Sequence, residues 1–225
     1  KKEDDAGYDK TAFEKMLEIK GDSDHTKLID MLTDLNDYSI GIEDVLKEHF
    51  DEENIVYWMA FQILMGNVDT QNRNVYLYSP LNSDIWYFIA WDNDGCLMRP
   101  EYELRNFSDQ NSWEKGISNY WGNILFQRCL KSDAFREKLD QVIEELRRYL
   151  SEERLEEMVE QYAGVVQPYV EKMPDQLNEP LTPEEYEQVK AGLPKEVEQN
   201  YEMYRESLEK PMPFYIGRPV TENGK

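Results

Sequence analysis

Residues 54–95 read NIVYWMAFQILMGNVDTQNRNVYLYSPLNSDIWYFIAWDNDG, and this stretch decides the fold. Its first part is apolar at positions that share one broad face of a helix: Ile55, Val56, Met59, Ala60, Ile63 and Leu64. We expect Asp51 to cap the start of this helix and Gly66 to end it. Residues 74–79 and 85–90 are rich in aromatic and β-branched residues, and a Pro-Leu-Asn-Ser-Asp turn separates them. They predict a β-hairpin.

Helical patterns dominate the rest of the chain. Apolar residues recur at helical spacing in residues 9–19, 24–35, 133–150, 152–170 and about 195–209. Ser132 is the expected N-cap of the helix that starts at residue 133, and residues 182–185, Thr-Pro-Glu-Glu, have the pattern of a capping box. The expected fold class is therefore mainly α (α+β), with one hairpin, in a single domain covering residues 1–225.

Composition limits the function. The 225 residues include 25 Lys and Arg against 47 Asp and Glu, which gives a net charge of -22. Such a charge repels nucleic-acid phosphates, so we expect no nucleic-acid partner. A macromolecular partner should be basic, or metal ions should bridge the protein to an anion. No apolar run reaches the roughly 20 residues of a membrane span. Cys96 and Cys129 lack the spacing of a zinc site, and the sequence leaves open whether they pair.

Polar residues gather at both ends of the predicted hairpin. Asp69 and Asn74 precede it with the Asp-x4-Asn spacing of a protein-kinase catalytic loop, in which the Asp orients the attacking hydroxyl and the Asn holds a metal ion. Asp92 and Asp94 follow the hairpin, where kinases place the Asp that binds magnesium. Asn67-Val68-Asp69 stands where typical kinases have His-Arg-Asp. The pattern fits phosphoryl transfer, because that chemistry requires hard oxygen ligands converging on a cation. The structural alternative is that these Asp and Asn residues only stabilise turns, and the spacing alone does not distinguish the two.

A calcium loop is the competing interpretation of residues 90–101. In a 12-residue EF-hand loop starting at Ala90, Asp92, Asp94, Gly95 and Glu101 fall at positions 3, 5, 6 and 12. Ala90 is a poor residue for position 1, and a strand-like run stands where the incoming helix belongs. A calcium-binding module therefore stays as an alternative.

The aromatic residues of the hairpin invite a nucleotide-stacking role. Alternation within a strand assigns most of them to the core: Tyr76, Tyr78, Trp86, Tyr87 and Phe88. Trp91 stands beside Asp92 and is a candidate wall of the site.

Residues 54–95 together resemble the CotH kinase family, the spore-coat protein H type of atypical protein kinase. The matching features are an apolar helix, Gly-Asn-x-Asp at 66–69, Asn-x-Tyr-hydrophobic-Tyr at 74–78, a strand, and Trp-Asp-x-Asp at 91–94. The segment YWGNILFQRCLKSDAFREKL at 120–139 is also similar to the family. The resemblance covers residues 25–172 and implies a kinase-like C-terminal lobe, with a helical extension over 173–225.

The resemblance implies a role for each site residue. Asp69 would be the catalytic-loop Asp, and Asn74 and Asp92 would bind the cofactor through Mg or Mn. Asp94 would add a second acidic group to the metal shell, and Asn67 would shape the loop. The implied activity is ATP-dependent phosphorylation of Ser or Thr in basic, Ser-rich coat or surface proteins. The implied location is the spore coat, or the cell envelope or extracellular space.

One departure from the kinase pattern bears on activity. Residues 1–50 show no Gly-rich loop and no strand Lys, so we expect the nucleotide-binding lobe to be largely absent from this chain. The chain alone is then expected to be inactive, and the kinase activity would belong to a full-length parent. The alternative is a non-catalytic spore-coat or cell-surface assembly module that keeps the fold without the chemistry.

Overall fold

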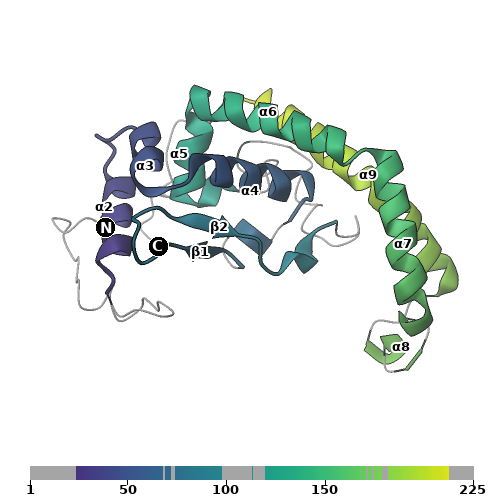
Figure 1. Cartoon of the computed structure of the whole chain (residues 1–225). Coiled ribbons are helices and arrows are strands. Elements are labelled where there is room, and N and C mark those ends of the chain that lie inside the picture. Colours follow the sequence, from purple (N-terminus) through teal and green to yellow (C-terminus); the bar gives the residue numbers. More distant parts are fainter. Residues whose placement is uncertain are drawn as a thin grey trace, which may run out of the picture.

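The computed structural model describes residues 24–67, 69–71, 74–97, 113, 120–170, 172–173, 175–178 and 182–212. The helix expected over residues 9–19 lies outside them. The helices are α2 (Thr26–Asn36), α3 (Ile42–His49), α4 (Glu52–Leu64), α5 (Ile124–Lys131), α6 (Asp133–Tyr149), α7 (Glu152–Val170), α8 (Asp175–Asn178) and α9 (Pro183–Leu208) (Figure 1). β1 (Tyr76–Tyr78) and β2 (Tyr87–Ile89) form a two-stranded sheet. This arrangement confirms the predicted fold class.

Helix α4 begins and ends as its sequence predicts. The Asp51 side chain accepts a hydrogen bond from the Asn54 N–H (2.9 Å) and so caps the first turn. At the other end Gly66 has a left-handed φ of 58°. The Gly66 N–H donates to the Ile63 carbonyl (3.1 Å), and the Asn67 N–H donates to the Gln62 carbonyl (3.0 Å). This pair of bonds is a Schellman motif, and it fixes where Asn67 leaves the helix.

The hairpin lies against α4 (Figure 1). β1 and β2 are antiparallel, and Tyr76 pairs with Ile89, Leu77 with Phe88, and Tyr78 with Tyr87. The Asn54 side chain of α4 donates to the Phe88 carbonyl (3.1 Å) and accepts from the Phe88 N–H (2.7 Å). This side-chain amide therefore takes the place of a neighbouring strand at the edge of β2.

Two hairpin tyrosines lie outside the core, contrary to the prediction. Trp86 and Phe88 are buried, but Tyr76 and Tyr78 are 50% and 53% exposed. Side chains alternate along a strand, and the one face of β1 that points inward carries Leu77, which packs against the core. The prediction failed because the second face of this small sheet has no described layer packed on it.

An aromatic cluster connects α4 with the hairpin and α5. Trp58 of α4 lies 4.7 Å from Phe88 and 5.6 Å from Phe126, measured between ring centroids. Tyr120 packs edge-on against Phe126 at 4.8 Å. Contacts between aromatic rings at these distances contribute stability in addition to that from burying their apolar surface. The cluster therefore holds β2 against α4 and α5.

Helices α7 and α9 run side by side away from the body, and α8 lies at their far end (Figure 1). The capping box at Thr182 and Glu185 is present, but the helix that it starts continues through Pro194 to Leu208. The predicted start near residue 195 was therefore wrong. Pro194 lacks an N–H, which costs about 3 kcal/mol in a helix interior. Packing of α9 against both α4 and α7 offsets this cost.

Lys27 of α2 holds the β1–β2 turn. Its Nζ donates to the Ser79 hydroxyl (3.1 Å) and to the carbonyls of Pro80 (2.7 Å) and Ser83. Lys27→Met is expected to lower the free energy of unfolding by about 1–3 kcal/mol, because the turn carbonyls lose a charged donor. Thermal unfolding followed by circular dichroism measures the change. The exposed Lys47→Met is the control, and equal melting temperatures for the two variants would contradict this role of Lys27.

Neither Cys96 nor Cys129 forms a disulfide. Cys129 is fully buried, and burial raises the pKa of its thiol well above the ordinary value. A maleimide is therefore expected to label the half-buried Cys96 in the native protein and to reach Cys129 only in denaturant. Mass spectrometry of labelled peptides distinguishes the two sites, and native labelling of Cys129 at the rate of Cys96 would contradict the burial.

Candidate functional site

The turns at the two ends of the hairpin contact each other. A Cβ atom added to Gly95, in the turn after β2, would lie 2.9 Å from Asn67 Oδ1 and 3.4 Å from Asp69 Cβ. The first distance is shorter than a side-chain contact permits, so the close approach requires glycine. The turn after α4 and the turn after β2 therefore form one surface. Asn67 in the first turn and Asn93 in the second are 26 positions apart in the sequence.

Asn67 and Asn93 join these turns through hydrogen bonds. Asn67 is fully buried, and its Oδ1 accepts from the Asp69 N–H (3.1 Å). Its Nδ2 donates to Asn93 Oδ1 (3.2 Å), which also accepts from Gln62 Nε2 of α4 (3.2 Å). The backbone position of Asp69 is thus set by a side chain that is itself bonded to the opposite turn.

Thr70 anchors the same turn to the aromatic cluster. Asp69 begins the 3₁₀-helix η1 (Asp69–Gln71), and the next residue, Thr70, is buried. Thr70 Oγ1 lies 2.7 Å from the Tyr120 hydroxyl, and either group can be the donor. Burial raises the pKa of Tyr120 above its ordinary value, so the phenol is protonated at neutral pH and can donate. The hydrogen bond between Thr70 and Tyr120 therefore fixes the turn that carries Asp69 to the aromatic cluster.

Backbone conformation is unusual at this end of the hairpin. Among the described residues, three that are not glycine have positive φ: Asn74 (56°), Asp92 (49°) and Leu97 (50°). Asn74 lies just before β1, Asp92 lies shortly after β2, and Leu97 follows the 3₁₀-helix η2 (Asn93–Gly95). Asn and Asp tolerate this region better than other side chains. Each such residue stores strain of order 1 kcal/mol, and strain of this kind concentrates at functional sites. Two of the three are predicted metal ligands.

The sheet register places Asn74 and Asp92 at the same end of the hairpin. Asn74 lies two residues before Tyr76 and Asp92 three residues after Ile89, and Tyr76 pairs with Ile89. Asp69 and Asn74 are half-buried, whereas Asp92 and Asp94 are exposed. The structure thus brings Asn67, Asp69 and the Asp92–Gly95 turn to one end of the fold. The catalytic and ligand roles of these residues remain predictions.

The donor chemistry fits a magnesium site that is completed by a substrate. Carboxylate and amide oxygens suit hard cations, and Mg²⁺ at phosphate sites uses one or two carboxylates, with water and phosphate oxygens supplying the rest. In the part of the chain that the structure describes, no three His, Cys, Asp or Glu side chains gather as a metal cage. Asp92 and Asn74 offer the carboxylate and amide oxygens that such a shared site uses.

The calcium alternative meets a structural obstacle. The residues before the loop form β2 and not the incoming helix of an EF-hand. Glu101, the expected bidentate ligand, lies outside the described residues. Trp91, beside Asp92, is 52% exposed and packs on Tyr76 with ring centroids 4.9 Å apart. An exposed aromatic pair thus borders the turn.

The sequence did not predict the contacts that support this site. They are made by Thr70 with Tyr120, by Asn93 with Asn67, and by Gly95 with Asn67 and Asp69. No local pattern marks Thr70 or Tyr120, and Gly95 was considered only as part of a calcium loop. The glycine directly after Asp-x-Asp was the one available signal, because a turn glycine often marks a close approach.

Comparison with known proteins identifies the class. The model of the family described as CotH kinase protein matches residues 1–204, so the chain belongs to the CotH kinase family. The match extends beyond residues 25–172 in both directions. No curated protein and no solved structure matches the chain. Membership makes this a kinase-like protein of the CotH type, a class that in general uses ATP and a divalent metal. In the described part of the chain, no helix has the length and apolar character to cross a membrane.

Proposed function

We propose that the complete protein transfers the γ-phosphoryl group of ATP to Ser or Thr hydroxyls of a basic protein. The observation that carries this proposal is the contact of Gly95 with Asn67 and Asp69. It joins the Gly-Asn-x-Asp turn to the Asp-x-Asp-Gly turn, and these are the two segments that the chemistry requires together.

Each residue has a distinct part in the proposed reaction. Asp69 accepts a hydrogen bond from the substrate hydroxyl and orients its oxygen toward the phosphorus. Asn74 and Asp92 hold Mg or Mn, and Asp94 adds negative charge beside them. The bound metal supplies neutralisation of the phosphate charge. Asn67 keeps Asp69 in place through its bond to the Asp69 N–H.

A fixed frame supports this chemistry. Phosphoryl transfer depends on positioning and on charge stabilisation more than on covalent catalysis, and small misplacements of a catalytic group are costly. The hydrogen bond between Thr70 and Tyr120 and the one from Asn67 to Asn93 hold the turn of Asp69 from two sides. Such support is what a positioned carboxylate needs.

Charge indicates the substrate class. A net charge of -22 attracts a basic protein and raises its association rate at low salt. A basic, Ser-rich coat or surface protein satisfies this charge and supplies the hydroxyl. Spore-coat or cell-envelope association agrees with the family.

Labelled ATP provides the test. The protein expressed from its complete gene and the 225-residue chain are each incubated with γ-labelled ATP, Mg²⁺ or Mn²⁺, and a Lys/Arg-rich, Ser-containing protein. We expect metal-dependent label on Ser or Thr with the complete protein. Absence of transfer under all metals would contradict the proposal and favour the non-catalytic assembly module.

A further inference from the structure

Gln62 is a buried polar residue in a helix whose buried side is otherwise hydrophobic. Its side chain is fully buried, and the other buried residues of α4, which the structure describes throughout, are hydrophobic. Gln62 Oε1 has no hydrogen-bond partner in the described part of the chain. A buried acceptor without a partner is unfavourable, and an apolar side chain of similar size would avoid this cost. Stability alone therefore does not explain a glutamine at this position.

The nitrogen of the same amide is bonded to the candidate site. Gln62 Nε2 donates to Asn93 Oδ1 (3.2 Å). This oxygen also accepts from Asn67 Nδ2 (3.2 Å), and Asn67 Oδ1 accepts from the Asp69 N–H (3.1 Å). Gln62 is therefore the helical end of a chain of hydrogen bonds that reaches Asp69 through Asn93 and Asn67.

The Asp69 N–H determines the orientation of all three amides. A backbone N–H can only donate, so Asn67 presents Oδ1 to it and Nδ2 to Asn93. Asn93 then presents Oδ1 to Asn67, and the group that reaches this oxygen from α4 must also be a donor. Gln62 meets that requirement through Nε2, which leaves its Oε1 unpaired. The unpaired oxygen is thus a consequence of the bond that Gln62 makes to Asn93.

Gln62 contacts both turns of the site. Its backbone carbonyl accepts from the Asn67 N–H (3.0 Å), and its side chain donates to Asn93 (3.2 Å). The helix that carries it is packed against α6, α9 and β2. Both turns are therefore tied to one fixed element through a single residue.

We propose that Gln62 is a positioning residue, whose amide holds the turn that carries Asp92 in a fixed place relative to Asp69. Asn93 lies between Asp92 and Asp94 in the chain, so a donor that holds Asn93 also restrains the two carboxylates predicted to bind the metal. As a statement about phosphoryl transfer, the inference rests on the proposed function.

Gln62→Met tests the proposal in the complete protein. Methionine is about as long as glutamine but cannot donate to Asn93. We expect an unchanged or higher melting temperature, because the variant leaves no unpaired oxygen at this position. We also expect the Asp69 amide hydrogen to exchange with deuterium about tenfold faster or more, because Asn93 and Asn67 lose their bond to α4. NMR at this amide measures the exchange.

Transfer of labelled phosphate gives the second readout. We expect Gln62→Met to lower kcat about tenfold or more, because small displacements of a catalytic group are costly. A residue with only a structural role would lower the melting temperature and leave kcat of the folded protein unchanged. The combination of retained stability and lost kcat therefore distinguishes positioning from structural support.

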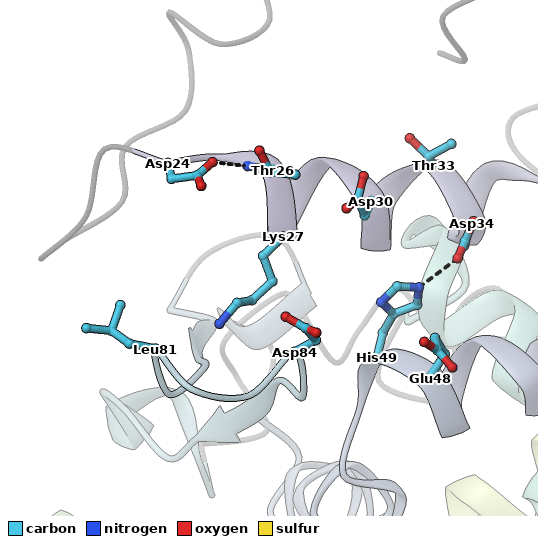
Figure 2. Close-up of a pocket in the computed structure, with 10 residues that line it drawn as sticks. All are labelled: Asp24, Thr26, Lys27, Asp30, Thr33, Asp34, Glu48, His49, Leu81 and Asp84. Atoms are coloured by element: carbon cyan, nitrogen blue, oxygen red, sulfur yellow. Dashed lines mark hydrogen bonds and ion pairs between the residues drawn. The ribbon is translucent and has the colours of Figure 1, made fainter.

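His49→Met is the matched control, because it replaces another buried polar side chain. His49 is 6% exposed, and its Nε2 lies 2.8 Å from Asp34 Oδ2 (Figure 2). Both residues line a pocket beside the β1–β2 turn, at the end of the hairpin opposite to Asp92. The variant is expected to lower the melting temperature by a few degrees, because Asp34 loses its partner. Exchange at the Asp69 amide and kcat should stay as in the wild type.

A double-mutant cycle tests whether Gln62 acts through Asn93. Asn93→Ala removes the oxygen that Gln62 and Asn67 share, and it should lower kcat at least as much as Gln62→Met does. The variant with both changes should match Asn93→Ala within about twofold, because the bond from Gln62 is already lost. Losses of kcat that multiply in the double variant would show that Gln62 acts by another route and would contradict the proposal.

The positioning role and the kinase activity fail separately. Amide exchange requires no transfer, so it decides the role of Gln62 even if the complete protein transfers no phosphate and the proposed function fails. Unchanged exchange at the Asp69 amide in Gln62→Met would overturn the positioning role. If that variant also transferred phosphate with the wild-type kcat, the kinase would stand without this role for Gln62.

Discussion

Replacing Asp92 with asparagine is expected to lower the rate of phosphoryl transfer by the complete protein about 10²- to 10³-fold. The change removes one negative charge at the metal and keeps the size of the side chain. Asn tolerates left-handed backbone, so the φ of 49° at this position is no obstacle to the variant. The loss should therefore arise from charge and not from misfolding.

Metal dependence gives this prediction its specificity. Asp92→Asn should require a higher Mg²⁺ or Mn²⁺ concentration for half-maximal transfer, measured with labelled ATP at saturating substrate. Asp69→Asn should lower kcat by a comparable factor without changing that metal requirement, because Asp69 acts on the hydroxyl. Glu157→Gln, exposed on α7, is the remote control and should behave as wild type. Wild-type activity in Asp92→Asn would refute the assignment of this residue.

Gly95→Ala is expected to lower the free energy of unfolding by about 1–3 kcal/mol and to reduce transfer about tenfold or more. A methyl group at this position would lie 2.9 Å from Asn67 Oδ1, so Asn67 must move and its bond to the Asp69 N–H must change. Urea unfolding measures the first effect, and the transfer assay measures the second.

Gly164→Ala is the matched control for this substitution. A Cβ at Gly164, in α7, meets nothing within 4 Å. Alanine there should leave transfer unchanged and raise stability by about 0.5–1 kcal/mol through helix propensity. If Gly95→Ala were as stable and as active as wild type, the two turns would not be in contact.

Local patterns predicted the elements that support the site. The cap at Asp51, the helix end at Gly66 and the hairpin each depend on residues within a few positions of one another, and all three are present. The N-cap at Ser132 and the capping box at Thr182 follow the same rule. Caps and turns of this kind can be predicted from a single sequence, because they depend on residues close together in the chain.

Long-range packing explains the failures. The continuity of α9 through Pro194 depends on α4 and α7, including the bond from buried Asn200 to the Leu64 carbonyl (2.8 Å). Helix propensity considers only the local residues, so it predicts that the helix breaks at Pro194. The exposure of Tyr76 and Tyr78 depends on what covers the second face of the hairpin, and alternation alone cannot tell which face is covered.

In the candidate site too, the local sequence pattern could be predicted, whereas the contacts between distant residues could not. Spacing and the family resemblance predicted a set of five site residues, whose roles remain predictions: Asn67, Asp69, Asn74, Asp92 and Asp94. Their supports, Thr70 with Tyr120 and Gly95 with Asn67, join residues far apart in the chain. Only the folded arrangement reveals these pairs.

The Asn54 amide, bonded to both backbone groups of Phe88, has a mechanical consequence. Because the same residue belongs to α4, the helix and β2 cannot slide past each other without breaking two hydrogen bonds at once. The turns that carry Asp69 and Asp92 leave this helix and this strand, so they move as one piece. If the protein binds ATP as proposed, we expect any closing motion around the nucleotide to move other parts of the protein relative to α4 and its hairpin.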